Sequence, residues 1–228
     1  MRLVDATWPE VRPESFGGRA PILVVPVGAL EQHGPHLPLD TDAAIATAVA
    51  AAVATERDRA ALAPTLPLGA SGEHAGFPGT LSIGADALNH VLVELVRSST
   101  PTFAAVLVVN GHGGNVEALR SVAALCTAEG RTLLPHPLGL PGMDAHAGRT
   151  ETSLMLHLDP SRVRLDRAAP GNTTPLRDLL PELRANGVRG VSPNGVLGDP
   201  AGASATEGAE LFDTLVERAL TVFDRLSG

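Results

Sequence analysis

The chain has 228 residues, of which 44% are hydrophobic and 18% are charged. This length and composition exclude a disordered chain and suffice for one sizeable α/β domain with a buried core. The net charge of −8 argues against nucleic acid as a partner, because contacts to phosphates need clustered Lys and Arg. No apolar run reaches the length of a membrane span, and the first residues lack the apolar core of a signal peptide. We therefore expect a soluble, cytoplasmic protein with no membrane association.

Apolar runs alternate with helical patterns along the chain. Residues 1–20 are irregular in pattern, and the run that follows them has the length and composition of a buried strand. Next comes an Ala-rich segment whose apolar residues recur every four positions, as in a helix. The predicted elements are strand 22–27, helix 42–57, a short strand within 61–66, helix 86–98, strand 103–109, a helix ending near 129, a short strand at 133–134, a helix ending near 157, and a final helix over 205–226.

The segment 159–204 breaks this alternation. It is rich in Pro, Gly and Asp, so we expect a surface excursion that contains one short helix at about 174–186. Elsewhere strands alternate with helices, and each connection is long enough for a right-handed crossover. The predicted fold is therefore an α/β fold, a three-layer α/β/α sandwich around a mostly parallel central sheet, formed by residues 1–228 as a single domain.

A dense polar stretch, residues 31–42, connects the first predicted strand to the first predicted helix. Glu31 and His33 are two residues apart and would face the same side of an extended chain, and Asp42 returns at the start of the helix. Carboxylates and imidazole that converge in this way are suited to divalent cations. The alternative is that Asp42 only caps the helix and that Glu31 and His33 are solvated.

Two further segments place polar side chains at comparable positions. His112 follows the strand at 103–109, and His146 and Glu151 lie at the start of a predicted helix. The carboxyl ends of parallel strands share one edge of a sheet, so the three segments can meet in one crevice. One His from each segment together with Glu31, Asp42 and Glu151 would be about enough for two divalent metals bridged by a carboxylate.

Each of these features also has an alternative interpretation. The glycines around His112 could serve a tight turn, or could hold a phosphate at a helix N-terminus, although no Lys follows them as a Walker loop requires. Glu151 could simply stabilise the helix dipole. Cys126, the single cysteine, is better explained as a buried apolar residue than as a nucleophile.

The remaining polar candidates lie in a Gly-rich segment and on predicted helices. Ser71, Glu73 and His74 could form the wall of a pocket or belong to a flexible surface loop. Structural roles are favoured for three further histidines: His90, His136 and His157.

Taken together, these motifs resemble the creatininase family of metal-dependent amidohydrolases. The matching segments are residues 27–39 with Glu31-Gln32-His33-Gly34-Pro35-His36, then Thr41-Asp42, then Asn110-Gly111-His112-Gly113-Gly114-Asn115, and finally His146-Ala147-Gly148 with Glu151-Thr152-Ser153. They occur in the family's order across most of the chain. The segment Ser71–Thr80 and the context of His146 look closest to members that process a modified precursor peptide.

The resemblance implies a dinuclear centre that holds two divalent metal ions. Glu31 and His112 would bind one ion, His33 the other, and Asp42 would bridge both. Creatininase itself has a further Glu at the position of Gly114, and Glu151 is our candidate to supply the missing carboxylate. Ligands of this kind, without thiolate, suit Zn, Fe(II) or Mn.

The resemblance also implies an activity. Two metals would activate a water molecule that attacks an amide carbonyl, and His146 matches the family's proton donor. Backbone N–H groups of Gly113 and Gly114 could hold the oxyanion, and Ser71, Glu73 and His74 would contact the substrate. The substrate implied is a modified precursor peptide, from which a Val-Tyr-derived C-terminal dipeptide is released. Family members commonly form homohexamers.

Two other functions stay open at this point. One is a small-molecule amidohydrolase that acts on a cyclic amide or a formamide, and the other is a non-catalytic metal-binding subunit. Creatinine is a poor candidate substrate, because creatininase lines its pocket with Tyr and Trp whereas this chain has no Tyr and only Trp8.

Overall fold

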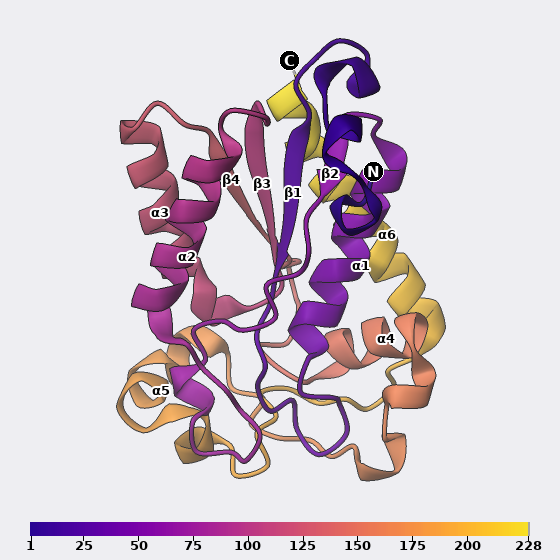
Figure 1. The fold of residues 1–228 in the computed structure, drawn as a ribbon. Coiled ribbons are helices and arrows are strands. Elements are labelled where there is room, and N and C mark those ends of the chain that lie inside the picture. Colours follow the sequence, from indigo (N-terminus) through magenta and orange to yellow (C-terminus); the bar gives the residue numbers. More distant parts are fainter. Residues whose placement is uncertain (228) are drawn as a thin grey trace.

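The computed structural model describes residues 1–227, and their centre is a parallel β-sheet (Figure 1). The sheet has four strands in the order β2-β1-β3-β4, and each neighbouring pair is parallel. The strands are β1 (Ile22–Val27), β2 (Ala60–Leu62), β3 (Ala105–Asn110) and β4 (Leu133–Pro137). The predicted mostly parallel sheet is therefore confirmed.

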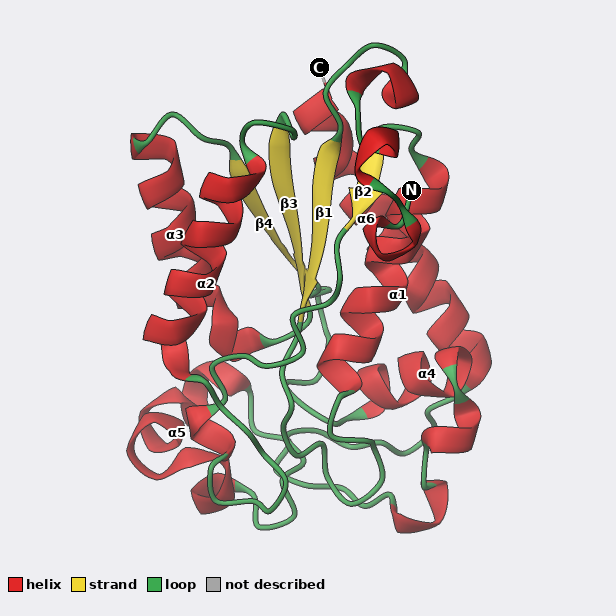
Figure 2. Ribbon diagram, in the orientation of Figure 1, coloured by secondary structure: helices red, strands yellow, loops and turns green. Residues whose placement is uncertain are grey.

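Helices cover both faces of the sheet, so the predicted three-layer sandwich is also confirmed (Figure 2). The helices α2 (Gly84–Ser99) and α3 (Val116–Ala128) lie on one face. The helices α1 (Thr41–Glu56) and α6 (Ala205–Ser227) lie on the other, and α4 (Arg149–Leu158) packs against α6. Among residues 1–227, no helix is long and apolar enough to cross a membrane.

The core consists of two apolar clusters, one on each face of the sheet. Along β1, Ile22 and Val24 belong to the cluster under α1 and α6, whereas Leu23 and Val25 belong to the cluster under α2 and α3. Successive side chains of a strand point to opposite faces, so a strand covered on both faces must be apolar throughout. This explains why the central strands are continuous apolar runs.

The segment 159–204 differs from the surface excursion that we expected. Its helix α5 (Leu176–Val191) is longer than predicted, and it is interrupted at Gly187. The chain then turns back into the molecule, where Leu197 is buried and its N–H donates to the carbonyl of His146 at 2.9 Å. At Gly195, with φ of 82°, a Cβ atom would lie 1.8 Å from Oε1 of Gln32. Glycine therefore lets this segment approach the loops at the carboxyl edge of the sheet, a contact that composition cannot predict.

The packing of β3 gives a first test of the fold. Leu107 is fully buried in this strand, so Leu107→Ala should lower the free energy of unfolding by about 2–5 kcal/mol through lost apolar contacts and a residual cavity. Leu125→Ala is the matched control, because that side chain is 43% exposed on α3 and should change stability by no more than about 0.5 kcal/mol. Urea denaturation measures both. Equal effects would contradict the assignment of β3 to the core.

Candidate metal centre

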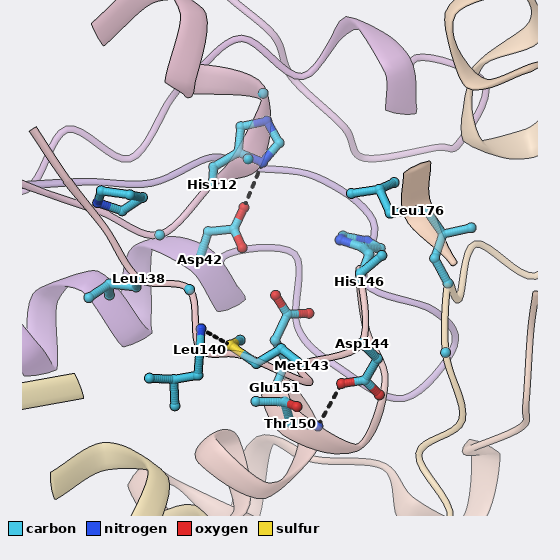
Figure 3. Close-up of a pocket in the computed structure, with 18 of the residues that line it drawn as sticks. Asp42, His112, Leu138, Leu140, Met143, Asp144, His146, Thr150, Glu151 and Leu176 are labelled. Atoms are coloured by element: carbon cyan, nitrogen blue, oxygen red, sulfur yellow. Dashed lines mark hydrogen bonds and ion pairs between the residues drawn. The ribbon is translucent and has the colours of Figure 1, made fainter. Parts of the chain in front are cut away.

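A cluster of buried polar side chains lies at the carboxyl edge of the sheet (Figure 3). Glu31 follows β1, Asp42 lies in the first turn of α1, and His112 follows β3. His146 and Glu151 come from the loop before α4 and from its first turn. The parallel topology thus brings together side chains that are up to 120 residues apart in the sequence (31 to 151).

Asp42 lies between two of the histidines. Its Oδ1 is 3.0 Å from Nε2 of His33, and its Oδ2 is 3.2 Å from Nδ1 of His112. Three sets of side chains have ligand atoms that all lie within 4.8 Å of one another, which is close enough to share a metal ion. These sets are Glu31, Asp42 and His112; His33, Asp42 and Glu151; and Glu31, His33 and His146.

Backbone carbonyls orient the rings of these histidines. Nδ1 of His33 lies 3.1 Å from the carbonyl oxygen of Glu31, and Nε2 of His112 lies 3.0 Å from that of Ala70. A carbonyl only accepts hydrogen bonds, so each of these nitrogens carries the proton and donates. The other nitrogen of each ring then faces Asp42, and it is the nitrogen by which the ring would bind a metal ion.

The electrostatics of the cluster favour positive charge. Burial alone would lower the pKa of His33, but attraction by Asp42, Glu151 and Glu31 raises it to about 10. Burial raises the pKa of Glu151 to about 7, despite the attraction of His33. Burial would likewise raise the pKa of Asp42, yet the neighbouring His33 and His112 hold it below its ordinary value. The carboxylates therefore create a strongly negative potential inside the protein.

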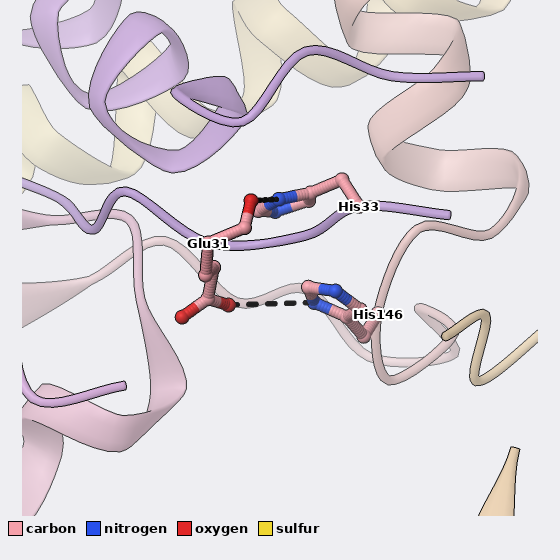
Figure 4. A group of neighbouring side chains, drawn as sticks. All are labelled: Glu31, His33 and His146. Atoms are coloured by element: carbon pink, nitrogen blue, oxygen red, sulfur yellow. Dashed lines mark hydrogen bonds and ion pairs between the residues drawn. The ribbon is translucent and has the colours of Figure 1, made fainter. Parts of the chain in front are cut away.

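Several oxygens of the cluster have no hydrogen-bond partner among residues 1–227. Both carboxylate oxygens of Glu31 and Oδ2 of Asp42 are in this state, although both side chains are buried. Oε1 of Glu31 does lie 3.3 Å from Nε2 of His74. It also lies 3.7 Å from Nδ1 of His146 (Figure 4). A buried carboxylate without hydrogen bonds is costly unless a cation compensates it. The donor set, of carboxylate oxygens and imidazole nitrogens, fits divalent metal ions.

Gln32 is a buried residue that we did not single out from the sequence. Its side-chain amide lies 2.9 Å from Nδ1 of His74 and donates to the carbonyl of Gly195 at 2.9 Å, while its Oε1 accepts from the N–H of Gly34. Its backbone carbonyl lies 2.7 Å from Nε2 of His146. By the same argument as above, His146 carries its proton on Nε2 and turns Nδ1 toward Glu31. The only sequence signal was the position of Gln32 inside the Glu31–His36 motif.

The other predicted residues lie around this cluster at different depths. His74 is buried, and burial lowers its pKa to about 4. Glu73 is half-buried, with Oε1 3.5 Å from Nε2 of His112. Gly113 and Gly114 line the same cavity, whereas Ser71 is buried but does not line it. The structure therefore favours a pocket wall over a flexible surface loop for Glu73 and His74.

Three further histidines and the cysteine lie away from the cluster. His90 is exposed on α2, His136 is buried in β4, and the ring of His157 lies 5.5 Å from that of Phe212. Cys126 is buried in the apolar core. These positions are consistent with the structural roles that we expected.

The cluster opens into a cavity of about 1300 Å³. One part of the wall is the loop between β4 and α4, and another part is α5. Both are largely apolar, and their side chains include Leu138, Leu140, Met143, Leu176, Leu180 and Leu183. A mostly apolar wall around a few convergent polar groups is typical of a small-molecule or peptide site.

At position 114 this chain has Gly, where creatininase has Glu. A Cβ atom at this position would lie 2.4 Å from Nε2 of His112 and 2.6 Å from Oε1 of Glu73. The carboxylate of Glu73 thus occupies space that a side chain at position 114 would need. Glu151 approaches from α4 instead, with Oε2 3.9 Å from Nε2 of His33.

Comparison with known proteins identifies the family. The family model described as "Creatininase: Creatinine amidohydrolase" matches residues 4–223. The chain belongs to the creatininase family. Creatinine amidohydrolase of Pseudomonas putida is 32% identical over 245 residues, a match that covers 93% of this chain and 92% of that protein. The resemblance of the motifs in the sequence is thereby confirmed.

Within the creatininase family, some relatives are more similar. The mycofactocin precursor peptide peptidase of Mycolicibacterium smegmatis is 52% identical over 202 residues, covering 86% of this chain and 81% of that protein. Among solved structures, one called "Creatininase Mn" superimposes with a TM-score of 0.80 at 26% identity. The match covers 100% of this chain and 99% of the chain in that structure. A glutamate-to-glutamine creatininase mutant of the Zn–Zn type gives the same TM-score of 0.80, and it covers 100% of this chain and 98% of its own.

The contacts of Gln32 lead to a second prediction. In Gln32→Glu the carboxylate keeps the acceptor for Gly34 but loses both N–H donors, so the carbonyl of Gly195 is left buried without a partner. The free energy of unfolding should fall by about 1–3 kcal/mol. Asn186→Gln is a control, because this amide is exposed on α5 and the change keeps both the donor toward Glu182 and the charge, so stability should change by no more than about 0.5 kcal/mol. Thermal unfolding measures both, and an unchanged Gln32→Glu variant would refute the role of Gln32 in joining these loops.

Proposed function

We propose that this chain is a dinuclear metal-dependent peptidase that releases the C-terminal dipeptide from a modified mycofactocin precursor peptide. The observation that carries the proposal is the buried ligand set around Asp42, whose two oxygens face different histidines. The relative at 52% identity is named for this activity on this precursor. Its match covers most of both chains, and a metal-dependent hydrolase is the activity expected of a creatininase family member.

The residues that would hold the metals form two sets that share Asp42. Glu31, Asp42 and His112 would bind one ion, and His33, Asp42 and Glu151 the other. The unpartnered buried oxygens and the orientation of both imidazoles support this assignment. In this arrangement Glu151 supplies the carboxylate that creatininase has at the position of Gly114. Zn, Mn and Fe(II) all suit these ligands, and related solved creatininases are named with Mn or Zn.

The chain's own residues would orient the substrate and move one proton. Bound divalent ions would lower the pKa of a water molecule and polarise an amide carbonyl. His146, held by its Nε2–H on the carbonyl of Gln32, turns Nδ1 into the site, where it would accept the proton that the attacking water loses and pass it to the leaving amine. The N–H groups of Gly113 and Gly114 would hold the carbonyl oxygen of the scissile bond.

The walls of the site favour a peptide with an apolar end over creatinine. Trp8 is 75% exposed and does not line the cavity, and among residues 1–227 no Phe, Tyr or Trp side chain lines it. The leucines and Met143 would instead contact the apolar side chains of the released dipeptide, and Glu73 and His74 would contact its neighbouring polar groups. Ser71, which is buried and does not line the cavity, would support this wall.

We further infer that the protein is a cytoplasmic homo-oligomer and, as in other family members, a hexamer. Light scattering can test the oligomeric state.

Counting bound metal tests the ligand assignment. The wild-type chain should bind about two divalent ions, Glu151→Gln about one and Asp42→Asn none, because Asp42 belongs to both sets. Asp40→Asn is the matched control: this half-buried carboxylate pairs with Arg162 rather than with the cluster, so both ions should remain. Elemental analysis of the purified proteins gives the counts. Full metal content in Asp42→Asn would exclude a shared ligand at this position.

Peptide cleavage tests the activity itself. Metal-loaded wild type should release the modified dipeptide from the precursor peptide, as followed by mass spectrometry. His146→Ala should lower kcat about 10²–10⁴-fold without loss of metal, whereas His90→Ala, on the exposed face of α2, should leave kcat unchanged. An uncleaved peptide together with hydrolysis of a lactam or formamide would support the small-molecule amidohydrolase. If Glu31→Gln loses metal yet keeps full biological activity, a non-catalytic subunit is the better explanation.

A further inference from the structure

A second cavity adjoins the one at the candidate metal centre. It has a volume of about 440 Å³ and lies between residues 72–76 and the second half of α5. Both cavities are lined by Glu73, Leu183 and Arg184, so they meet at these three side chains. Because Oε1 of Glu73 is 3.5 Å from Nε2 of His112, the junction is next to the ligand cluster. The two cavities therefore share side chains that lie next to the ligand cluster.

The walls of this groove are held in place by contacts across its end. Nη1 of Arg189 donates to the carbonyl of Gly76 at 2.6 Å, and its guanidinium lies 5.8 Å from the centre of the Phe77 ring. The break of α5 at Gly187 brings this part of the helix close to Glu73: a Cβ atom at position 187 would lie 2.8 Å from the Glu73 carbonyl. The groove is thus formed without a bound partner, which reduces the cost of ordering a ligand in it.

The chemistry of the groove differs from that of the main cavity. Its side chains include Glu73, Arg184 and Asn186, and among residues 1–227 it has one large aliphatic side chain, Leu183. Arg184 is exposed and forms no ion pair with any residue in the described range 1–227. Arg184 can donate to peptide carbonyls and Glu73 can accept from a peptide N–H, whereas the apolar walls of the main cavity suit side chains.

We propose that this groove binds the extended backbone of the substrate residues that precede the scissile bond. The inference rests on the proposed function, because a peptidase that removes only two residues must accommodate the rest of a long chain on the other side of the cut. The released dipeptide occupies the apolar cavity, the scissile bond lies at the metal cluster, and the preceding residues pass Glu73 into the groove. Binding of these remote residues contributes to the rate on long substrates only.

Two substrates and one blocking variant separate this role from catalysis. One substrate is the full-length modified peptide, and the other is an acetylated peptide that keeps a single residue before the scissile bond. Ala185→Trp places an indole in the groove from the exposed face of α5. It should lower kcat/KM for the long peptide about tenfold, mostly through KM, and change the value for the short peptide less than about twofold. Ala124→Trp, at an exposed position of α3 outside both cavities, should change neither.

A binding measurement tests the groove without relying on turnover. A second variant shows whether the result depends on the folding of the first. The precursor fragment that lacks the last two residues should inhibit the wild type competitively and should bind Ala185→Trp and Asn186→Trp about tenfold more weakly. Equal losses for the long and the short peptide, or no loss for either, would overturn the groove assignment. If the wild type cleaves neither peptide, the proposed function fails instead, and the two failures are therefore distinguishable.

Discussion

The site depends on the burial of two carboxylates, Glu31 and Asp42, whose neighbouring positive groups are histidines. Burial of an anion is costly, and here the hydrogen-bonding capacity of both groups is only partly used. Histidines surround them, with rings oriented by backbone carbonyls so that their free nitrogens point inward. A purely structural role does not explain this arrangement, because apolar side chains in the same place would stabilise the fold more than buried charges do. A cation-binding site explains it.

The parallel sheet allows this many polar groups to lie close together without disrupting the apolar core. Its strands are apolar on both faces, so the polar residues are confined to the loops at one edge. Those loops are also connected to one another: Nε2 of His36 lies 2.9 Å from Oγ1 of Thr152, next to Glu151 in α4. The loop after β1 therefore positions its own ligands and is joined to the helix that supplies another. A rigid scaffold of this kind holds a preorganised site.

This chain differs from creatininase in the walls of the site as well as at Gly114. The wall here is built from a loop rich in Pro and Leu and from an interrupted helix, α5, and it contains no Phe, Tyr or Trp from the described part of the chain. Such a wall leaves room for a chain that enters from one side, and Glu73 occupies the space next to Gly114. Members of one family can differ in substrate through the segments that surround a common site.

Much of this protein could be predicted from its sequence. Hydrophobic periodicity located the strands and most helices, because a side chain's burial repeats with the geometry of its own element. Local motifs also singled out Glu31, His33, Asp42, His112, His146 and Glu151, which the structure brings together. By contrast, the tertiary structure alone revealed the contacts of Gln32, the return of residues 192–198 to the site, and the groove beside α5. These features arise from contacts between segments distant in the chain, and no local pattern encodes which glycine, amide or carbonyl will meet across such a distance.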